Sequence, residues 1–253
     1  MISSSEKKKL FSLILDLGKE VELIKQSNFN VSLKADKSPV SQADLLINNE
    51  LAQFFCKSKI KNVISEENNE VDYALRKKWE YFWLLDPIDG TKEFITKGKD
   101  YTINVALCLK NKPIFSIVYA PARNEFYTAE KGNGARLNNK NINVSTSKEL
   151  IIVASKSHLN EGTKKYIQKI SSMQKVSLIQ FGSSLKICKI AEGKAHLYPR
   201  FGPTMEWDTC AADLILEEAG GLMTTIDKKA ITYNKKNLMN PFFIASASEK
   251  NIL

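Results

Sequence analysis

The chain has very little histidine and cysteine, and both shortages exclude kinds of metal site. Only two of its 253 residues are histidines, His158 and His196, so a histidine-based zinc centre is not expected. The four cysteines are Cys56, Cys108, Cys188 and Cys210. They show no Cys-x-x-Cys spacing, and each lies in an apolar stretch. We therefore expect reduced thiols that pack in the interior, in a reducing compartment, rather than disulfides or zinc ligands.

Long hydrophobic runs are also missing. No apolar segment approaches the ~20 residues of a membrane span. The lysine-rich N-terminus leads into an amphipathic pattern and not into the apolar core of a signal peptide. We expect a cytoplasmic chain without a transmembrane segment, while association with a membrane surface is left open.

Signatures of nucleic-acid-binding proteins and of phosphate-binding glycine loops are absent as well. The net charge is +9, but the lysines are spread along the chain instead of forming one block. Such a charge fits a solvated lysine-rich surface, and it also fits a field that steers a phosphate ester or nucleic acid. Because no RNA-binding aromatic signature, zinc-finger spacing, P-loop or G-x-G-x-x-G occurs, we predict no nucleic-acid partner.

Alternating helices and strands are what the sequence does contain. Apolar spacing predicts helices over residues 6–27 and 42–57, and Ser41 with Asp44 three residues later predicts the cap of the second helix. Strands are predicted in the first half over residues 29–33, 63–65, 81–85, 102–109, 114–119 and 125–130. Hairpin spacing between the later strands indicates an α+β layer structure.

From about residue 150 the pattern changes to regular alternation of strand and helix. Strands are predicted over residues 151–154 and 176–181 and near Met223 and Ile244, and helices over residues 161–171, 184–192 and 208–219. This alternation favours an α/β, doubly wound sheet. The polar, asparagine-rich residues 138–147 are the predicted boundary, so we expect domains over residues 1–147 and 148–253.

A strand that ends in two acids is the most informative feature. The apolar run stops at Asp86, and Pro87 keeps this acid extended, so Asp89 follows through a tight, irregular turn. Gly90 lets the backbone approach a ligand, and Thr91 adds a hydroxyl and a backbone N–H at a predicted helix start. The arrangement aims two carboxylates at one point and predicts a metal together with a phosphate.

Further acids lie at two distant places in the chain. Glu66 follows a predicted strand, and Asp208 stands where a helix is predicted to begin. Alone, Glu66 fits a solvated loop and Asp208 fits a plain helix N-cap. Glu66, Asp86 and Asp89 offer hard oxygen ligands at three places, a set that suits magnesium better than zinc.

Taken together, these motifs resemble the magnesium-dependent, lithium-sensitive inositol monophosphatase superfamily. The resemblance rests on Ser65-Glu66-Glu67, Asp86-Pro87-Ile88-Asp89-Gly90-Thr91, Trp207-Asp208 and Glu218-Ala219-Gly220-Gly221. Residues 92–95, directly after the Asp-Gly-Thr turn, resemble its CysQ branch, the 3'(2'),5'-bisphosphate nucleotidases, as do residues 36–41, 182–186 and 197–204. The resemblance spans nearly the whole chain and implies a layered αβαβα sugar-phosphatase-like fold.

The resemblance also implies a role for each site residue. The implied magnesium ligands are Glu66, Asp86, the Ile88 carbonyl, Asp89 and Asp208. Glu66 and Thr91 would orient the attacking water, Asp36 would hold outer waters, and the N–H groups of Gly90 and Thr91 would bind phosphate oxygens. The implied nucleotide contacts are Ser183, Ser184, Lys186, Arg200 and His158. From the residues alone, Ser183 and Ser184 also fit a helix cap, and Lys186 and His158 also fit solvated surface positions.

We therefore predict a phosphoric monoester hydrolase of sulfur metabolism. It would remove the 3'-phosphate of adenosine 3',5'-bisphosphate to give AMP, and 3'-phosphoadenylyl sulfate carries the same group. An inositol monophosphatase or related sugar-phosphate phosphatase is the alternative, and a non-catalytic binding protein on the same fold is the rival from another class. Residues 1–147 would bind the metal and residues 148–253 the substrate.

The orientation of Glu206, which precedes Trp207, is left open by the sequence. Its side chain either adds negative charge near the metals or points away from them.

Overall fold

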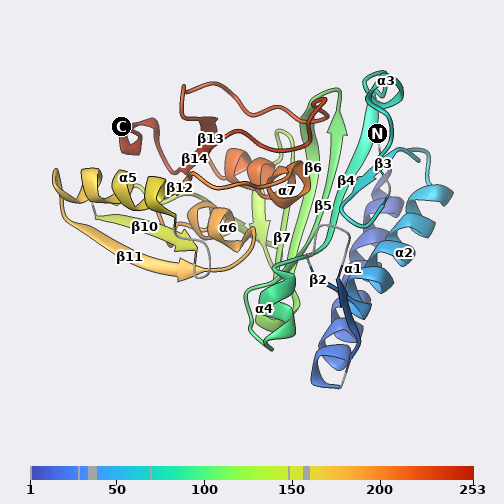
Figure 1. Cartoon of the computed structure of the whole chain (residues 1–253). Coiled ribbons are helices and arrows are strands. Elements are labelled where there is room, and N and C mark those ends of the chain that lie inside the picture. Colours follow the sequence, from blue (N-terminus) through green and yellow to red (C-terminus); the bar gives the residue numbers. More distant parts are fainter. Residues whose placement is uncertain (1, 28, 34–38, 69, 148, 156–159) are drawn as a thin grey trace.

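The chain folds into alternating layers of helices and sheets. The computed structural model describes residues 2–27, 29–33, 39–68, 70–147, 149–155 and 160–253. In Figure 1 the helices α1 (Ser4–Gln26) and α2 (Gln42–Lys57) cover one face of a large sheet, and α6 (Leu185–Ala191) and α7 (Glu206–Glu218) lie between this sheet and a smaller one. The outermost layer is α5 (Glu161–Ser171). This order confirms the predicted αβαβα architecture.

The large sheet forms the centre of the first half. Its seven strands lie in the order β3-β4-β5-β6-β7-β8-β9. The strands are β3 (Val63–Ser65), β4 (Tyr81–Asp89), β5 (Thr102–Leu109), β6 (Lys112–Ala120), β7 (Glu125–Glu130), β8 (Ala135–Leu137) and β9 (Lys140–Ile142). Side chains alternate across it, so Phe82 and Leu84 pack with α6 and α7, while Trp83 and Leu85 pack with α1 and α2. Both faces are therefore buried, which explains the continuous apolar run of β4.

A β-bulge at the end of β4 decides where its acids point. Asp86 pairs with Asn104 and Asp89 with Thr102, so the register shifts between the two acids. In a regular strand, residues three apart face opposite sides, and the extra residue of a bulge brings them to the same side. The predicted strand end at Asp86 is wrong because the strand continues through the bulge to Asp89. Both carboxylates consequently face the α6–α7 layer.

The smaller sheet has the order β11-β10-β12-β14-β13. Its strands are β10 (Leu150–Ser155), β11 (Val176–Phe181), β12 (Leu197–Arg200), β13 (Leu222–Thr225) and β14 (Phe243–Ser246). β10 is parallel to β11 and β12, whereas β14 is antiparallel to β12 and β13. The sheet is therefore mixed, and the expectation of a doubly wound sheet holds only for its first strands.

The remaining elements are short. They are β1 (Val31–Leu33), β2 (Pro39–Ser41), α3 (Tyr73–Arg76), α4 (Thr91–Ile95) and the 3-10 turns η1 (Pro121–Arg123) and η2 (Glu249–Asn251). Three of the cysteines are buried as expected, but Cys56 on α2 is exposed, so its prediction as a packing thiol is wrong. No helix in the described ranges has both the length and the apolar character that a membrane crossing needs.

Candidate metal and phosphate site

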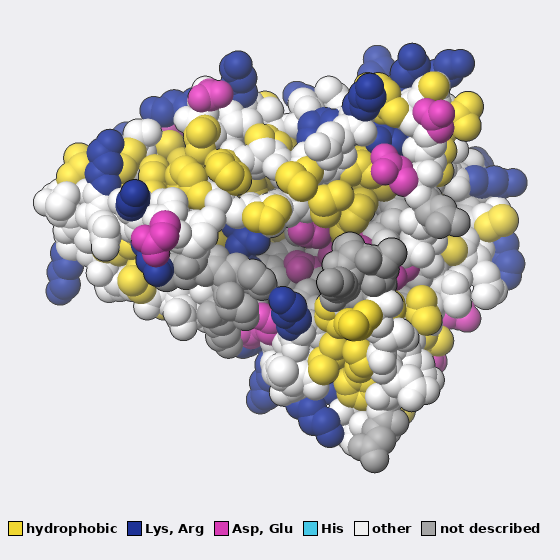
Figure 2. Space-filling view, in the orientation of Figure 1, with side chains coloured by type: hydrophobic (Ala, Val, Ile, Leu, Met, Phe, Trp, Pro, Cys, Tyr) yellow, Lys and Arg dark blue, Asp and Glu magenta, His cyan; other side chains and the backbone are white. Residues whose placement is uncertain are grey.

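Three carboxylates from distant parts of the chain converge beside the large sheet. One oxygen from each of Glu66, Asp86 and Asp208 lies within 4.8 Å of the others. Parallel pairing of β3 with β4 places Glu66 next to Asp86, because Ser65 pairs with Leu85 and the Glu66 N–H donates to the Leu85 carbonyl. In Figure 2 acidic side chains lie in a hollow near the middle of the face shown.

Asp86 is the buried acid of this cluster. It is only 1% exposed, and both of its carboxylate oxygens are without a hydrogen-bond partner among the described residues. Burial raises the pKa of Asp86 well above its ordinary value, and the charges of Glu66 and Asp89 raise it further. Burial and the Asp89 charge likewise raise the pKa of Asp208. Clustered buried carboxylates repel one another unless a cation neutralises them, so the donor set fits a divalent ion.

Asp89 lies at the border of this cluster. Its Oδ2 accepts a hydrogen bond from the Ser184 N–H at 2.5 Å. Burial raises the pKa of Asp89 to about 6, against the lowering effect of the nearby Lys186 charge. The structure thus places Asp89 between the three grouped acids and the start of α6.

Thr91 opens α4 directly after the bulge. Gly90 has a left-handed φ of 92° and turns the chain there. The Thr91 hydroxyl lies 3.1 Å from the Ile88 carbonyl oxygen and 3.5 Å from Asp44 Oδ1. Burial raises the pKa of Asp44 to about 6. The sequence identified Asp44 only as a capping residue. Its contact with the Thr91 hydroxyl could not be predicted, because no local sequence signal indicates it.

A cleft of about 290 Å³ joins these groups to the second half of the chain. The predicted site residues among its lining are Glu66, Asp89, Gly90, Thr91, Ser183, Ser184, Lys186, Arg200 and Asp208. Two further predicted residues, Asp36 and His158, lie outside the described residues. The cleft therefore brings three predicted acids and the predicted cations to one place, whereas Asp86 and Ile88 do not line it.

Cations also line the cleft. Lys186 is buried, and its Nζ donates to the Ser183 carbonyl at 2.6 Å and lies 5.4 Å from the Tyr198 ring centroid. Burial lowers the pKa of Lys186 to about 8. The Nη2 of Arg200 donates to the Pro203 carbonyl at 2.9 Å, and its buried Nε has no partner in the described part of the chain. The alternative of a solvated Lys186 is therefore wrong.

A tight turn before α6 is anchored from two sides. The Gly182 N–H donates to Asp100 Oδ2 at 3.2 Å, and Asp100 is itself paired with Arg123. The Ser184 hydroxyl is bonded inside the large sheet, to Thr102 at 2.8 Å and to Asn104 at 2.9 Å. Ser184 therefore makes no side-chain helix cap. These contacts join segments about 80 positions apart, so local sequence patterns did not indicate them.

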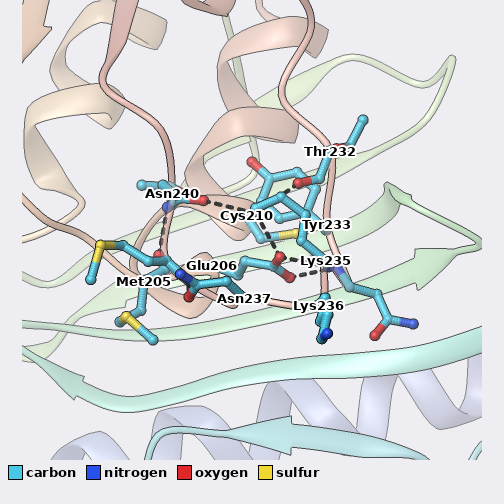
Figure 3. Close-up of polar contacts among 12 residues, drawn as sticks. Met205, Glu206, Cys210, Thr232, Tyr233, Lys235, Lys236, Asn237 and Asn240 are labelled. Carbon is cyan, nitrogen blue, oxygen red and sulfur yellow. Dashed lines mark hydrogen bonds and ion pairs between the residues drawn. The ribbon is translucent and has the colours of Figure 1, made fainter. Parts of the chain in front are cut away.

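The start of α7 shows that Asp208 is not a helix N-cap, and it settles which way Glu206 points. The helix begins at Glu206, and Asp208 accepts a hydrogen bond from the Met205 N–H at 2.9 Å, so Asp208 is not the N-cap residue. Figure 3 shows Glu206 turned toward residues 232–237, where its carboxylate accepts from the backbone N–H groups of Asn234 and Lys235. Glu206 is fully buried there and points away from the grouped acids.

Comparison with known protein families identifies the family of this chain. The model of the Inositol monophosphatase family matches residues 7–251. The chain belongs to the inositol monophosphatase family. Among curated proteins, the 3'(2'),5'-bisphosphate nucleotidase CysQ of Escherichia coli K12 is 37% identical over 224 residues, covering 86% of this chain and 89% of that protein. The protein of the same name from Buchnera aphidicola is 35% identical over 229 residues, covering 88% and 85%.

Solved structures of related proteins have the same fold as this family member. CysQ from Bacteroides thetaiotaomicron superposes with a TM-score of 0.84 at 35% identity, covering 93% of this chain and 95% of that one. The suhB protein from Bartonella henselae gives a TM-score of 0.82 at 25% identity, covering 98% and 96%. The resemblance found in the sequence and the predicted fold class are thereby confirmed.

Proposed function

We propose that this chain is a Mg²⁺-dependent phosphatase that removes the 3'-phosphate of adenosine 3',5'-bisphosphate to give AMP and phosphate. One observation carries the proposal: the cleft is lined both by the carboxylates of Glu66, Asp89 and Asp208 and by the cations Lys186 and Arg200. Metal-assisted hydrolysis needs the carboxylates, and a second phosphate needs the cations. The names of the CysQ relatives support this assignment.

The carboxylates would hold the metal. The proposed ligands are Glu66, Asp86, the Ile88 carbonyl, Asp89 and Asp208. When bound there, Mg²⁺ offsets the negative charge of the carboxylates, polarises the phosphate and lowers the pKa of a water. The division into a metal-binding part, residues 1–147, and a substrate-binding part, residues 148–253, stays a prediction, and Asp208 from the second part would complete the metal site.

The chain's own groups orient the reactants. The Thr91 hydroxyl has Asp44 and the Ile88 carbonyl as acceptors, so its proton is directed away from the cleft. Its lone pairs can therefore accept a hydrogen bond from a water that Glu66 also holds, which positions this water for in-line attack. The backbone N–H groups of Gly90 and Thr91 bind phosphate oxygens.

A phosphate-release assay tests the proposal. We expect adenosine 3',5'-bisphosphate to be hydrolysed with a higher kcat/KM than inositol 1-phosphate or fructose 1,6-bisphosphate, and chelation of Mg²⁺ to abolish all turnover. Preference for inositol 1-phosphate would replace the proposed substrate by the alternative, an inositol monophosphatase. Turnover that survives complete chelation would contradict the metal site itself.

Gly182→Ala tests whether the anchored turn positions the substrate. An added Cβ would lie 2.7 Å from the Asp100 carbonyl oxygen and 2.9 Å from the Asp100 Cβ, so the backbone must shift. We expect the KM for the bisphosphate to rise by about tenfold, because the adjacent serines move with the turn. Gly202→Ala is the matched control, since its Cβ would have no contact closer than 3.5 Å. An unchanged KM in Gly182→Ala would exclude this positioning role.

A further inference from the structure

A second hollow lies at the opposite end of β4 from the acids. We call it the lysine groove; its volume is about 680 Å³. It is lined by Tyr73, Lys77, Lys78, Trp79, Glu80, Lys110, Asn111, Thr232, Tyr233, Asn234 and Lys235. Residues 77–80 precede the first residue of β4, whereas Asp86 and Asp89 lie at its other end. The nine residues of β4 therefore separate the groove from the catalytic cleft.

The groove is positive. It contains four lysines and one acid, Glu80; because Lys235 is paired with Glu206, the other three lysines and Glu80 leave a formal charge of +2 from three minus one. Lys77, Lys78 and Lys110 are exposed and make no ion pair with any residue that the structure describes. In Figure 2 basic side chains gather at the end of the molecule where Figure 1 places α3. Charges of one sign in a concave surface concentrate a field that attracts anions.

Aromatic rings form part of the same walls. Trp79 is half-buried and packs against Phe82 with ring centroids 6.4 Å apart, which fixes its orientation. Tyr73 is also half-buried, and Tyr233 is buried. A flat ring can stack on a partly exposed aromatic side chain, while nearby lysines bind phosphates. This combination is the chemistry that recognises a nucleotide.

The floor of the groove is attached directly to α7. Lys235 Nζ lies 2.6 Å from Glu206 Oε1, and the Tyr233 hydroxyl donates to Asp213 Oδ2 at 2.7 Å. Figure 3 shows Lys235 reaching Glu206 at the start of the helix. The same helix turn carries Asp208, a proposed metal ligand. An anion bound beside Lys235 would therefore act on a side chain that holds the first turn of α7.

We propose that the lysine groove is a second nucleotide site, which binds a nucleoside diphosphate or triphosphate. Its volume falls within the range of about 300–1,000 Å³ typical of small-molecule sites. Its unpaired lysines match a chain of two or three phosphates better than a single phosphate. The proposal rests on the groove alone and does not depend on which phosphate ester the catalytic cleft hydrolyses.

Equilibrium dialysis with radiolabelled ADP, at fixed free Mg²⁺, tests the site. We expect the triple variant Lys77→Glu, Lys78→Glu, Lys110→Glu to lose about tenfold or more in ADP affinity, as three ion pairs to phosphate become repulsive. The matched control Lys164→Glu, Lys165→Glu, Lys169→Glu makes the same charge change on exposed positions of α5. Equal losses in both variants, or a loss only in Lys186→Met of the catalytic cleft, would overturn the proposal.

Tryptophan emission provides an independent readout. Trp79 lies in the groove, whereas Trp83 is buried and Trp207 lies outside the groove. We expect ADP to change the tryptophan emission of the wild type and of Trp207→Phe. The emission of Trp79→Phe should stay unchanged when ADP is added. A signal that disappears with Trp207→Phe and persists in Trp79→Phe would contradict binding in the groove.

Discussion

Asp86→Asn is expected to lower kcat by about 10³-fold or more, while the metal-free protein stays at least as stable as the wild type. Both effects follow from the position of Asp86, whose buried carboxylate has no partner for either oxygen in the described chain. With a cation bound, this carboxylate would be a ligand; without one, it is buried next to Glu66 and Asp208, whose negative charges disfavour its ionised form. An asparagine removes that charge and can donate to a neighbouring carboxylate.

Two measurements separate these effects. The first is kcat with the bisphosphate across a range of Mg²⁺ concentrations, and the second is the thermal midpoint with and without Mg²⁺. Because a ligand that binds only the folded state stabilises it, Mg²⁺ should raise the midpoint of the wild type more than that of Asp86→Asn. Asp213→Asn is the control: Asp213 lies on α7 but bonds to Tyr233 and not to the grouped acids. A near-normal rate in Asp86→Asn would remove Asp86 from the metal site.

Local signals in the sequence were sufficient for several elements. The helix over 42–57 was predicted with its observed bounds because Ser41 and Asp44 form a capping box, in which each side chain bonds the other's backbone. The same holds for the strand over 63–65, which delivers Glu66. Asp86 and Asp89 indicated a metal site because the proline between them predicts a tight turn that aims both carboxylates at one point. The family resemblance then supplied the partner acid, Asp208.

Long-range geometry explains what the sequence did not reveal. The bulge that turns Asp86 and Asp89 to one side appears only in the pairing of β4 with β5. Whether Glu206 faces the grouped acids depends on residues 232–240, which fold back over the start of α7. The second role of Asp44 depends on Thr91, which is 47 positions away. In each case the deciding partner lies far along the chain, where periodicity and spacing carry no information.

Lys186→Met is expected to raise the KM for adenosine 3',5'-bisphosphate by about 10²-fold and to change the KM for inositol 1-phosphate much less. Lys186 projects from the first turn of α6 into the cleft, where it opposes Asp89 and is desolvated. A buried ammonium gains more from a phosphate partner than an exposed one does, because water screens it less. The methionine keeps most of the side-chain volume, so packing against Tyr198 is retained.

The increase in KM for the bisphosphate, divided by the increase in KM for inositol 1-phosphate, shows which of the two substrates Lys186 serves. If Lys186 binds a second phosphate, a substrate with one phosphate has nothing to lose there, and only the bisphosphate suffers. Lys194→Met, at an exposed lysine just after α6, is the matched control and should leave both KM values unchanged. Thermal unfolding of Lys186→Met shows whether the fold is intact. Equal increases in both KM values would instead assign Lys186 to the scissile phosphate, and the cations of the cleft would no longer favour a bisphosphate over inositol 1-phosphate.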